Sequence, residues 1–260
     1  MRFLGVDLAW SPRNTSAGAV LHWGGDCATL VAWRDDLTGD ADVVAWMMAQ
    51  AGETDALVAI DAPLIVPNET GARPCDREIT RRFGRYHAGA HPANRRNLER
   101  YGGLRGERLV ELLERHGFAH VRSLERQGEV RGILEVYPHP AMVNLFGLGQ
   151  ILKYKSRPGR TYEMRWAELR RYQNHLRALS NAEPAIRLPS EITDRQVEGL
   201  RGRALKRYED LLDAAFCAYI ALYCWAWGPT HYRIFGDLAN GYIVVPVLAQ
   251  AKAQKGEVLP

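Results

Sequence analysis

A mixed α/β fold is predicted by this 260-residue sequence, with a three-stranded antiparallel meander joined to parallel strands and flanked by helices. Three observations predict it. Three apolar runs separated by turn residues open the chain, at 2–10, 16–23 and 28–33. A helical segment at 40–51 leads to a fourth apolar run at 56–61, as a crossover connection between parallel strands requires. A fifth apolar run at 131–138 and a long apolar helix at 205–227 follow.

The first half of the chain is delimited by turn chemistry and helix signals. Residues 11–15 separate the first two apolar runs, and Gly24, Gly25 and Asp26 separate the second from the third. Segment 40–51 opens on acidic residues and closes before Gly52, with apolar residues at helical spacing. The run 56–61 ends at Pro63, which stops a strand ladder. We therefore expect a meander, a crossover helix and a central strand.

The second half is predicted to add helical insertions, one more strand, a buried helix and a terminal hairpin. Residues 75–83 and 105–116 read as helices, and 141–148 as a short helix after the strand at 131–138. Segment 205–227 is apolar nearly all round, which is typical of a helix buried against a sheet. Runs 231–235 and 241–245 predict a hairpin. We expect one domain over residues 1–260, with insertions at approximately 64–128 and 150–203.

The composition is that of a folded protein, with 47% hydrophobic and 25% charged residues. The start of the chain has no long apolar region and no small-residue cleavage site. The most apolar later stretch, 211–227, begins beside Asp210 and contains Asp213, which argues against a membrane span. The four cysteines form no Cys-x-x-Cys pair. We expect a cytoplasmic protein with reduced cysteines and no membrane partner; the sequence leaves the oligomeric state open.

Positive charge is concentrated in two segments. The net charge is +4, but residues 73–108 hold ten Arg against four acids, and residues 153–177 hold eight basic residues against two acids. The remainder of the chain is therefore acidic. This asymmetry predicts a polyanionic partner such as nucleic acid, the alternative being solvated helix faces. Aromatic residues interleave the second segment, where they could stack on bases or form core: Tyr154, Tyr162, Trp166 and Tyr172.

Single acidic residues interrupt four of the predicted apolar elements. Asp7, Asp61 and Glu135 lie in strands, and Asp213 lies in the late helix, three residues after Asp210 on the same helical face. A lone Asp at a strand end is often a turn or cap former, whereas Glu is rarely buried unless it is paired. Since sites form beyond the carboxyl ends of parallel strands, we expect Asp7, Asp61, Glu135 and Asp213 to converge there.

A buried group of carboxylates predicts divalent cations, because mutual repulsion would otherwise prevent them from all ionising. Oxygen ligands favour Mg²⁺ or Mn²⁺ over zinc. Two such ions, roughly 3.5–4 Å apart, stabilise the attacking and leaving oxygens of an in-line phosphoryl displacement. The sequence therefore predicts two Mg²⁺ or Mn²⁺ ions, with Asp7, Asp61, Glu135 and Asp213 as catalytic ligands and Asp210 as a further ligand.

The order of these elements and acids resembles the ribonuclease H-like fold of ribonucleases H, transposases, integrases and Holliday-junction resolvases. More narrowly, several motifs resemble the domain of unknown function 429 family, described as predicted nucleases of that fold: Gly5-Val6-Asp7, Ala59-Ile60-Asp61-Ala62-Pro63-Leu64, Arg73-Pro74-Cys75-Asp76-Arg77-Glu78, Glu135-Val136-Tyr137-Pro138, Tyr154-Lys155 and Asp210-Leu211-Leu212-Asp213-Ala214. The ending from Gly236 to Pro246 is similar too.

The resemblance implies a metal-dependent nuclease that hydrolyses phosphodiester bonds of nucleic acid, with the four carboxylates as ligands. Arg73, Arg77, Tyr154 and Lys155 fall in the family's motifs and are expected on the substrate side. Our hypothesis gives Arg77 and Lys155 the phosphate contacts, since basic side chains commonly take that role beside metal centres.

Two other functions compete with a nuclease. One is a non-catalytic nucleic-acid-binding module, in which the basic segments grip the polyanion and the acids are structural. The other is a nucleotide-binding enzyme like the actin-like ATPases and sugar kinases, which also place an Asp on a first strand. Those proteins follow that strand with a glycine-rich phosphate loop, whereas the turn at 11–15 contains no glycine.

Overall fold

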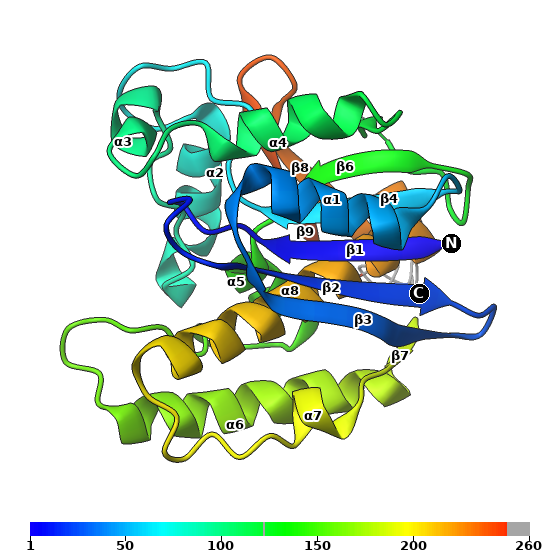
Figure 1. Ribbon diagram of the computed structural model, residues 1–260. Coiled ribbons are helices and arrows are strands. Elements are labelled where there is room, and N and C mark those ends of the chain that lie inside the picture. The colour runs from blue at the N-terminus through cyan, green and yellow to red at the C-terminus, as the bar shows by residue number, and fades with distance from the viewer. Residues whose placement is uncertain (122, 249–260) are drawn as a thin grey trace, which may run out of the picture.

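A seven-stranded mixed sheet forms the centre of the computed structural model, which describes residues 1–121 and 123–248 (Figure 1). The strand order is β5-β6-β4-β1-β2-β3-β7. The bounds are β1 (Arg2–Asp7), β2 (Ser16–Trp23), β3 (Cys27–Leu37), β4 (Ala56–Asp61), β5 (Ala119–His120), β6 (Arg131–Glu135) and β7 (Ala185–Arg187). Strands β1, β2 and β3 form an antiparallel meander, and β1, β4, β6 and β5 run parallel. The mixed α/β prediction is confirmed, and this arrangement is consistent with a ribonuclease H-like fold.

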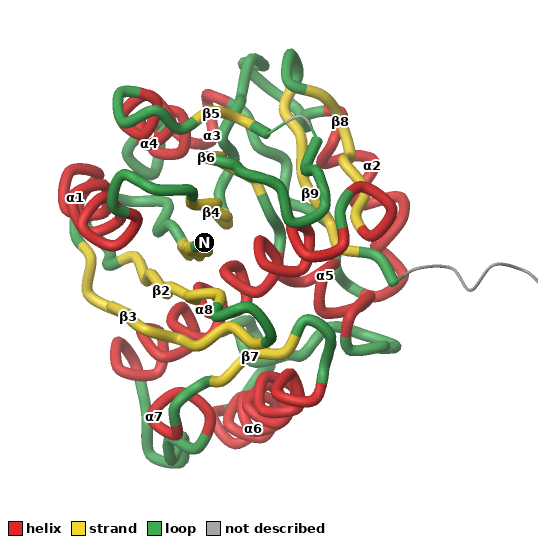
Figure 2. Tube along the Cα trace, turned by 90° about the vertical axis from the view of Figure 1, so that its right-hand side faces the viewer, coloured by secondary structure: helices red, strands yellow, loops and turns green. Residues whose placement is uncertain are grey.

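Helices cover both faces of the sheet (Figure 2). One face carries α1 (Gly39–Ala51) and α4 (Arg105–Glu114), and the other carries α8 (Gly202–Trp227), α5 (Pro138–Leu145) and the hairpin of β8 (Tyr232–Asp237) and β9 (Gly241–Pro246). The remaining helices are α2 (Pro74–Phe83), α3 (Arg95–Glu99), α6 (Tyr162–Ala178) and α7 (Ser190–Thr193). Within the described ranges, no helix has both the length and the apolar character needed to traverse a bilayer.

Alternate residues of each central strand belong to separate cores, as the two-residue period of a strand requires. Leu4 and Val6 pack with α1 and α4, whereas Phe3 faces α8. Gly5 shares the α8 face, and a Cβ built on it would lie 2.0 Å from the carbonyl oxygen of Ala214. Helix α8 therefore lies directly on the backbone of β1, an approach that only glycine permits.

Most predicted elements are confirmed, including the meander, the crossover helix, the central strands, the buried helix and the hairpin. Two strands escaped prediction because they are short: β5 has two residues and β7 has three, too few for a periodic pattern. The segment between β4 and β6 holds α2, α3, α4 and β5, and the segment between α5 and α8 holds α6, α7 and β7. Strand β7 returns to the sheet and pairs with β3.

Candidate metal centre

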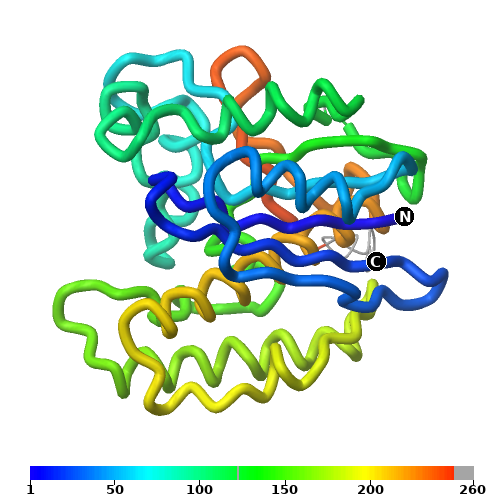
Figure 3. Tube along the Cα trace, viewed as in Figure 1, coloured from blue at the N-terminus to red at the C-terminus, as the bar shows by residue number. Residues whose placement is uncertain are grey.

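The candidate centre lies at the carboxyl ends of β1 and β4, where segments from distant parts of the chain meet (left side of Figure 3). The strands are parallel, and the register pairs Asp7 with Asp61. Because residues two apart in a strand point to the same face, Asp7 shares the face of Gly5 and Asp61 shares the face of Ala59. Ala59 belongs to the core beneath α8. The two predicted carboxylates are thus neighbours on the α8 side of the sheet.

Helix α8 adds two further carboxylates. Asp210 lies one helical turn before Ala214, the residue that touches the backbone of Gly5, so the start of α8 faces the end of β1. Carboxylate oxygens of Asp7, Asp210 and Asp213 all lie within 4.8 Å of one another. Asp213 is 1% exposed and Asp210 4%. The structure therefore brings together three of the five predicted ligands, with Asp61 beside them.

The ammonium group of Lys155 lies among these three carboxylates. Its Nζ is 2.5 Å from Asp213 Oδ2 and 3.4 Å from both Asp7 Oδ2 and Asp210 Oδ1. The loop that carries Lys155 is held by α6, because Arg165 Nε donates to the carbonyl oxygen of Tyr154 at 3.0 Å. Lys155 is thus placed where a positive charge offsets the repulsion between the acids.

Tyr154 positions a carboxylate and does not face substrate. The residue is fully buried, and its hydroxyl donates to Asp213 Oδ1 at 2.6 Å. The hydroxyl of Tyr172 lies 3.2 Å from the same oxygen. The sequence placed Tyr154 on the substrate side, and the structure corrects this: it holds Asp213 in place from within the core. Tyr172 likewise belongs to the core rather than to a stacking surface.

The pKa values around the centre show an excess of negative charge. Burial, then the charge of Asp7, raises the pKa of Asp61 well above its usual range. Burial also raises the pKa of Asp213, and that of Asp210 to about 7. Burial would raise the pKa of Asp7 too, but Lys155 and Lys206 outweigh it and lower the pKa. The carboxylates thus compete for the available positive charge, which is the condition under which a further cation binds.

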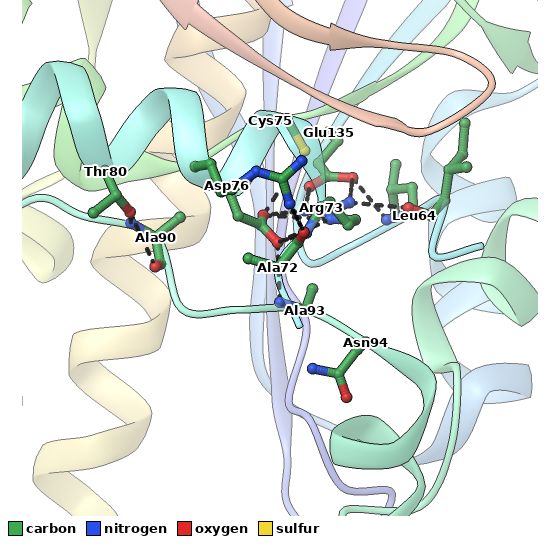
Figure 4. A network of polar contacts seen from close by, with 12 residues as sticks. Leu64, Ala72, Arg73, Cys75, Asp76, Thr80, Ala90, Ala93, Asn94 and Glu135 are labelled. Carbon is green, nitrogen blue, oxygen red and sulfur yellow. Dashed lines mark hydrogen bonds and ion pairs between the residues drawn. The ribbon is translucent and has the colours of Figure 1, made fainter. Parts of the chain in front are cut away.

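Glu135 lies outside the group of Asp7, Asp210 and Asp213. Strand β6 pairs Glu135 with Ile60, not with Asp61, so the two acids are one residue out of register, although both line the same pocket. The carboxylate of Glu135 is paired with Arg73 (Figure 4): Arg73 Nη2 is 2.6 Å from Oε1 and Nη1 is 2.9 Å from Oε2. The backbone N–H of Leu64 also donates to Oε2, at 2.8 Å. The expected convergence of Glu135 with Asp7 is not what the structure shows.

Arg73 and Arg77, both expected to contact substrate, differ in their surroundings. Arg73 is 2% exposed and bridges Glu135 and Asp76, with its Nη2 atom 2.9 Å from Asp76 Oδ1 (Figure 4). Its guanidinium is therefore occupied by two buried carboxylates, which corrects its assignment as a substrate contact. Arg77 is exposed on α2 and donates to the carbonyl oxygen of Ala72. No hydrogen bond or ion pair joins it to the three carboxylates among the residues that the structure describes.

Many cations of the two basic segments are paired with acids. These pairs are Arg95–Glu107, Arg105–Asp40, Arg108–Asp40, Arg165–Glu209, Arg170–Glu198, Arg171–Glu168 and Arg177–Asp194. The local charge excess is therefore smaller in the folded protein than the sequence segments indicate. Exposed arginines remain on α2 and in the loop before α6, among them Arg81, Arg82 and Arg157.

Two residues near the centre were missed by sequence reasoning. Lys206 forms an ion pair with Asp210, and their spacing of four on one helix is a signal that could have identified it. His139 lies within electrostatic range of Lys155 and Asp7, and its Nδ1 is buried without a hydrogen-bond partner among the described residues. A single His between two prolines gave no comparable signal.

The donor set fits a hard divalent cation. Asp7, Asp210 and Asp213 offer only carboxylate oxygens, which suit Mg²⁺ or Mn²⁺ rather than zinc. Two of the three are fixed on one helix, and Asp213 is held further by Tyr154, so these ligands are largely preorganised. Asp61, the register partner of Asp7, is a further carboxylate beside them.

Comparison with known proteins agrees with the motifs. A family model described as "Protein of unknown function (DUF429)" matches residues 5–236, a range that includes all the acids described above. No curated protein and no solved structure matches the chain.

Proposed function

The chain belongs to the DUF429 family of proteins of unknown function, and we propose that it is a Mg²⁺- or Mn²⁺-dependent phosphodiesterase acting on nucleic acid. One observation carries the proposal: Asp7, Asp210 and Asp213 place carboxylate oxygens within 4.8 Å of one another beyond the carboxyl end of a central parallel strand. Such a position is the usual location of sites in open α/β sheets. A group of buried acids there costs stability unless cations compensate it.

Each side chain has a defined part in this proposal. Asp7, Asp210 and Asp213 would hold one ion, and Asp61, beside Asp7, is the carboxylate available to a second. Bound ions would supply Lewis-acid stabilisation of the phosphoryl group and an acidified water nucleophile. The hydroxyl of Tyr154 keeps Asp213 Oδ1 in place, at 2.6 Å, and so limits reorganisation of the centre.

Lys155 is proposed to bind the phosphate. Its side chain is 27% exposed, whereas those of Asp210 and Asp213 are nearly inaccessible, so Lys155 lies at the solvent side of the centre. Lysine has a flexible stem and a compact charge, which allow the ammonium to turn from the carboxylates to a phosphate oxygen. Exposed arginines on α2 and in the loop before α6 support a polyanionic substrate.

Cleavage assays test the proposal. Purified protein is incubated with single-stranded DNA, RNA and duplex DNA in Mg²⁺, Mn²⁺ or EDTA. We expect cleavage that needs the metal and falls about a hundredfold or more in Asp7→Asn and Asp213→Asn, since loss of one ligand removes several kcal/mol of transition-state stabilisation. Asp26→Asn, at an exposed turn, is the matched control.

Circular dichroism must show that the variants are folded. Cleavage that survives unchanged in Asp7→Asn, or that proceeds equally in EDTA, would reject the proposal. Tight nucleic-acid binding with no cleavage of any substrate would favour the non-catalytic binding module.

A further inference from the structure

An exposed tryptophan stands beside the candidate metal centre. Trp10 follows Asp7 by three residues and is 40% exposed. The backbone on both sides of it is held by Arg105, a buried residue of α4, whose Nη1 donates to the carbonyl oxygens of Ala9 and Ser11. Arg105 is fixed in turn by Asp40, with Nε 2.7 Å from Oδ1. A buried guanidinium thus fixes a large apolar ring that gains little from its own burial.

Other rings surround the indole. Tyr101, 50% exposed, lies with its ring centroid 5.5 Å from that of Trp10 and nearly perpendicular to it, at 85°. His91 lies 6.4 Å away at 89°. Exposed aromatic residues that cluster in this way are typical of binding surfaces rather than of ordinary surface composition.

A pocket connects these rings to the carboxylates. It is open to solvent on one side, and its wall includes Trp10, His91, Tyr137 and Asp61. The other lining residues are mostly apolar, and the buried Arg73 ion-pair network closes one side. Asp61 lines this pocket and is also the register partner of Asp7, so it lies beside the acidic group. A ligand in the pocket would therefore lie next to the proposed reaction centre.

Positive charge lies at the edge of the same pocket. Arg157 is exposed, and its Nη2 is 2.9 Å from His91 Nε2. Arginine can only donate, so Arg157 is the donor in this contact. Lys155 precedes Arg157 by two residues. The pocket thus combines flat apolar rings, which suit another planar ring, with cations that suit a phosphate.

We propose that the pocket of Trp10, His91 and Tyr137 is a base subsite, which takes an unpaired nucleobase of the strand whose phosphate lies at the carboxylates. This inference rests on the proposed function and deepens it: the preferred substrate is single-stranded or frayed nucleic acid. Bases in an intact duplex are stacked on their neighbours and cannot offer a ring face to protein aromatic groups, whereas unpaired bases can.

Oligonucleotide binding tests the subsite without requiring cleavage. The full-length protein is titrated, in Ca²⁺, into a fluorescently labelled single strand, the same strand carrying abasic sites, and its duplex, with strand integrity checked on a gel. DNA and RNA versions are both used. We expect Trp10→Ala to weaken binding of the base-bearing strand about tenfold, the usual effect of removing one stacking ring. We expect Trp10→Phe to retain most of the affinity.

Trp33→Ala is the matched control, because Trp33 is similarly exposed, at 38%, on β3 and does not line the pocket. We expect this variant to bind like the wild type. The wild type should bind the abasic strand about as weakly as Trp10→Ala binds the base-bearing strand. On the abasic strand, the wild type and Trp10→Ala should have the same affinity. Equal weakening of the base-bearing and abasic strands by Trp10→Ala, or no weakening at all, would overturn the subsite.

The outcomes separate this inference from the proposed function. If the wild type cleaves in a metal-dependent way and Trp10→Ala binds the base-bearing strand normally, the base subsite is rejected and the phosphodiesterase proposal stands. If Trp10→Ala loses affinity only for the base-bearing strand and the wild type cleaves no substrate, the subsite stands and the phosphodiesterase proposal is rejected.

Discussion

Asp213 and Glu135 are both buried acids of central elements, yet their partners differ. Asp213 accepts a hydrogen bond from Tyr154 and forms an ion pair with Lys155, whose ammonium group lies at the solvent side of the centre. Glu135 is paired with Arg73, which is itself buried and bonded to Asp76. A metal ligand must be free to exchange its partner for an ion. The partly exposed Lys155 side chain can move from Asp213 towards solvent, whereas the buried Arg73 side chain cannot leave Glu135 without losing its ion pair inside the protein.

Arg73 is therefore predicted to stabilise the fold rather than bind substrate. Arg73→Met leaves Glu135 and Asp76 buried without their counter-ion, and we expect a loss of about 3–5 kcal/mol in the free energy of unfolding. Urea unfolding measures this. The double variant Arg73→Met/Glu135→Gln should recover part of the loss, because it removes one of the unpaired charges. Little loss of stability in Arg73→Met, combined with a large loss of oligonucleotide affinity, would restore Arg73 as a phosphate contact.

His139 predicts a pH dependence of stability. Burial, then the charge of Lys155, lowers the pKa of His139 to about 3, from about 6.5 in an unfolded chain. Well above pH 6.5, His139 is neutral in both states and does not destabilise the folded state. As the pH falls from 6.5 towards 3, only the unfolded chain takes up the proton, so the free energy of unfolding decreases by up to about 1.4 kcal/mol per pH unit.

Replacement of this ring checks the pH effect. Between pH 7.5 and 5.5, we expect wild-type protein to lose about 1.4 kcal/mol more stability than His139→Phe in urea unfolding. His22→Gln, at an exposed position, is the control and should behave like the wild type. The same pH dependence in His139→Phe as in wild type would show that another group is responsible.

The candidate metal centre depends on how closely helix α8 approaches strand β1. A Cβ at Gly5 would lie 2.0 Å from the carbonyl oxygen of Ala214 and 2.3 Å from the backbone nitrogen of Ala218. Both atoms belong to a helix backbone that cannot adjust locally. Because Asp213 lies next to Ala214, a helix displaced from Gly5 would also carry its carboxylate away from Asp7.

Gly5→Ala is predicted to damage both stability and the centre. We expect a loss of about 3 kcal/mol or more in the free energy of unfolding, the upper end of overpacking costs, together with weaker Mn²⁺ binding. Thermal unfolding and calorimetry measure the two effects. Gly149→Ala is the matched control, since Gly149 has open space around it and an ordinary backbone conformation. A Gly5→Ala variant as stable as this control would contradict the described packing.

The order of the main elements was predictable from sequence, and so was the position of Asp7 and Asp61 at strand ends and of Asp213 within the late helix. Apolar periodicity and turn residues carry that information locally. The partner of Glu135 was not predictable, because Arg73 is 62 residues away in the sequence and reaches Glu135 only in the folded chain. Nor could the sequence reveal that Lys155 reaches the acids across a loop, 148 residues from Asp7.

For the whole molecule, the charge asymmetry of the sequence is only partly retained on the surface. Ion pairs neutralise many cations of the two basic segments, while Arg157 and Lys155 stay close to the carboxylates and the Trp10 pocket. Cations, aromatic rings and acids therefore meet at one end of the sheet. This coincidence of three chemistries, rather than the net charge of +4, is what favours nucleic acid as the partner.

The proposed function depends on the claim that Asp7, Asp210 and Asp213 bind a divalent cation, and isothermal titration of Mn²⁺ into the metal-free protein measures that binding. We predict saturable binding to the wild type and to Asp26→Asn and Glu135→Gln, and its loss in Asp7→Asn. No saturable binding to the folded wild type, or binding that Asp7→Asn leaves unchanged, would contradict the claim.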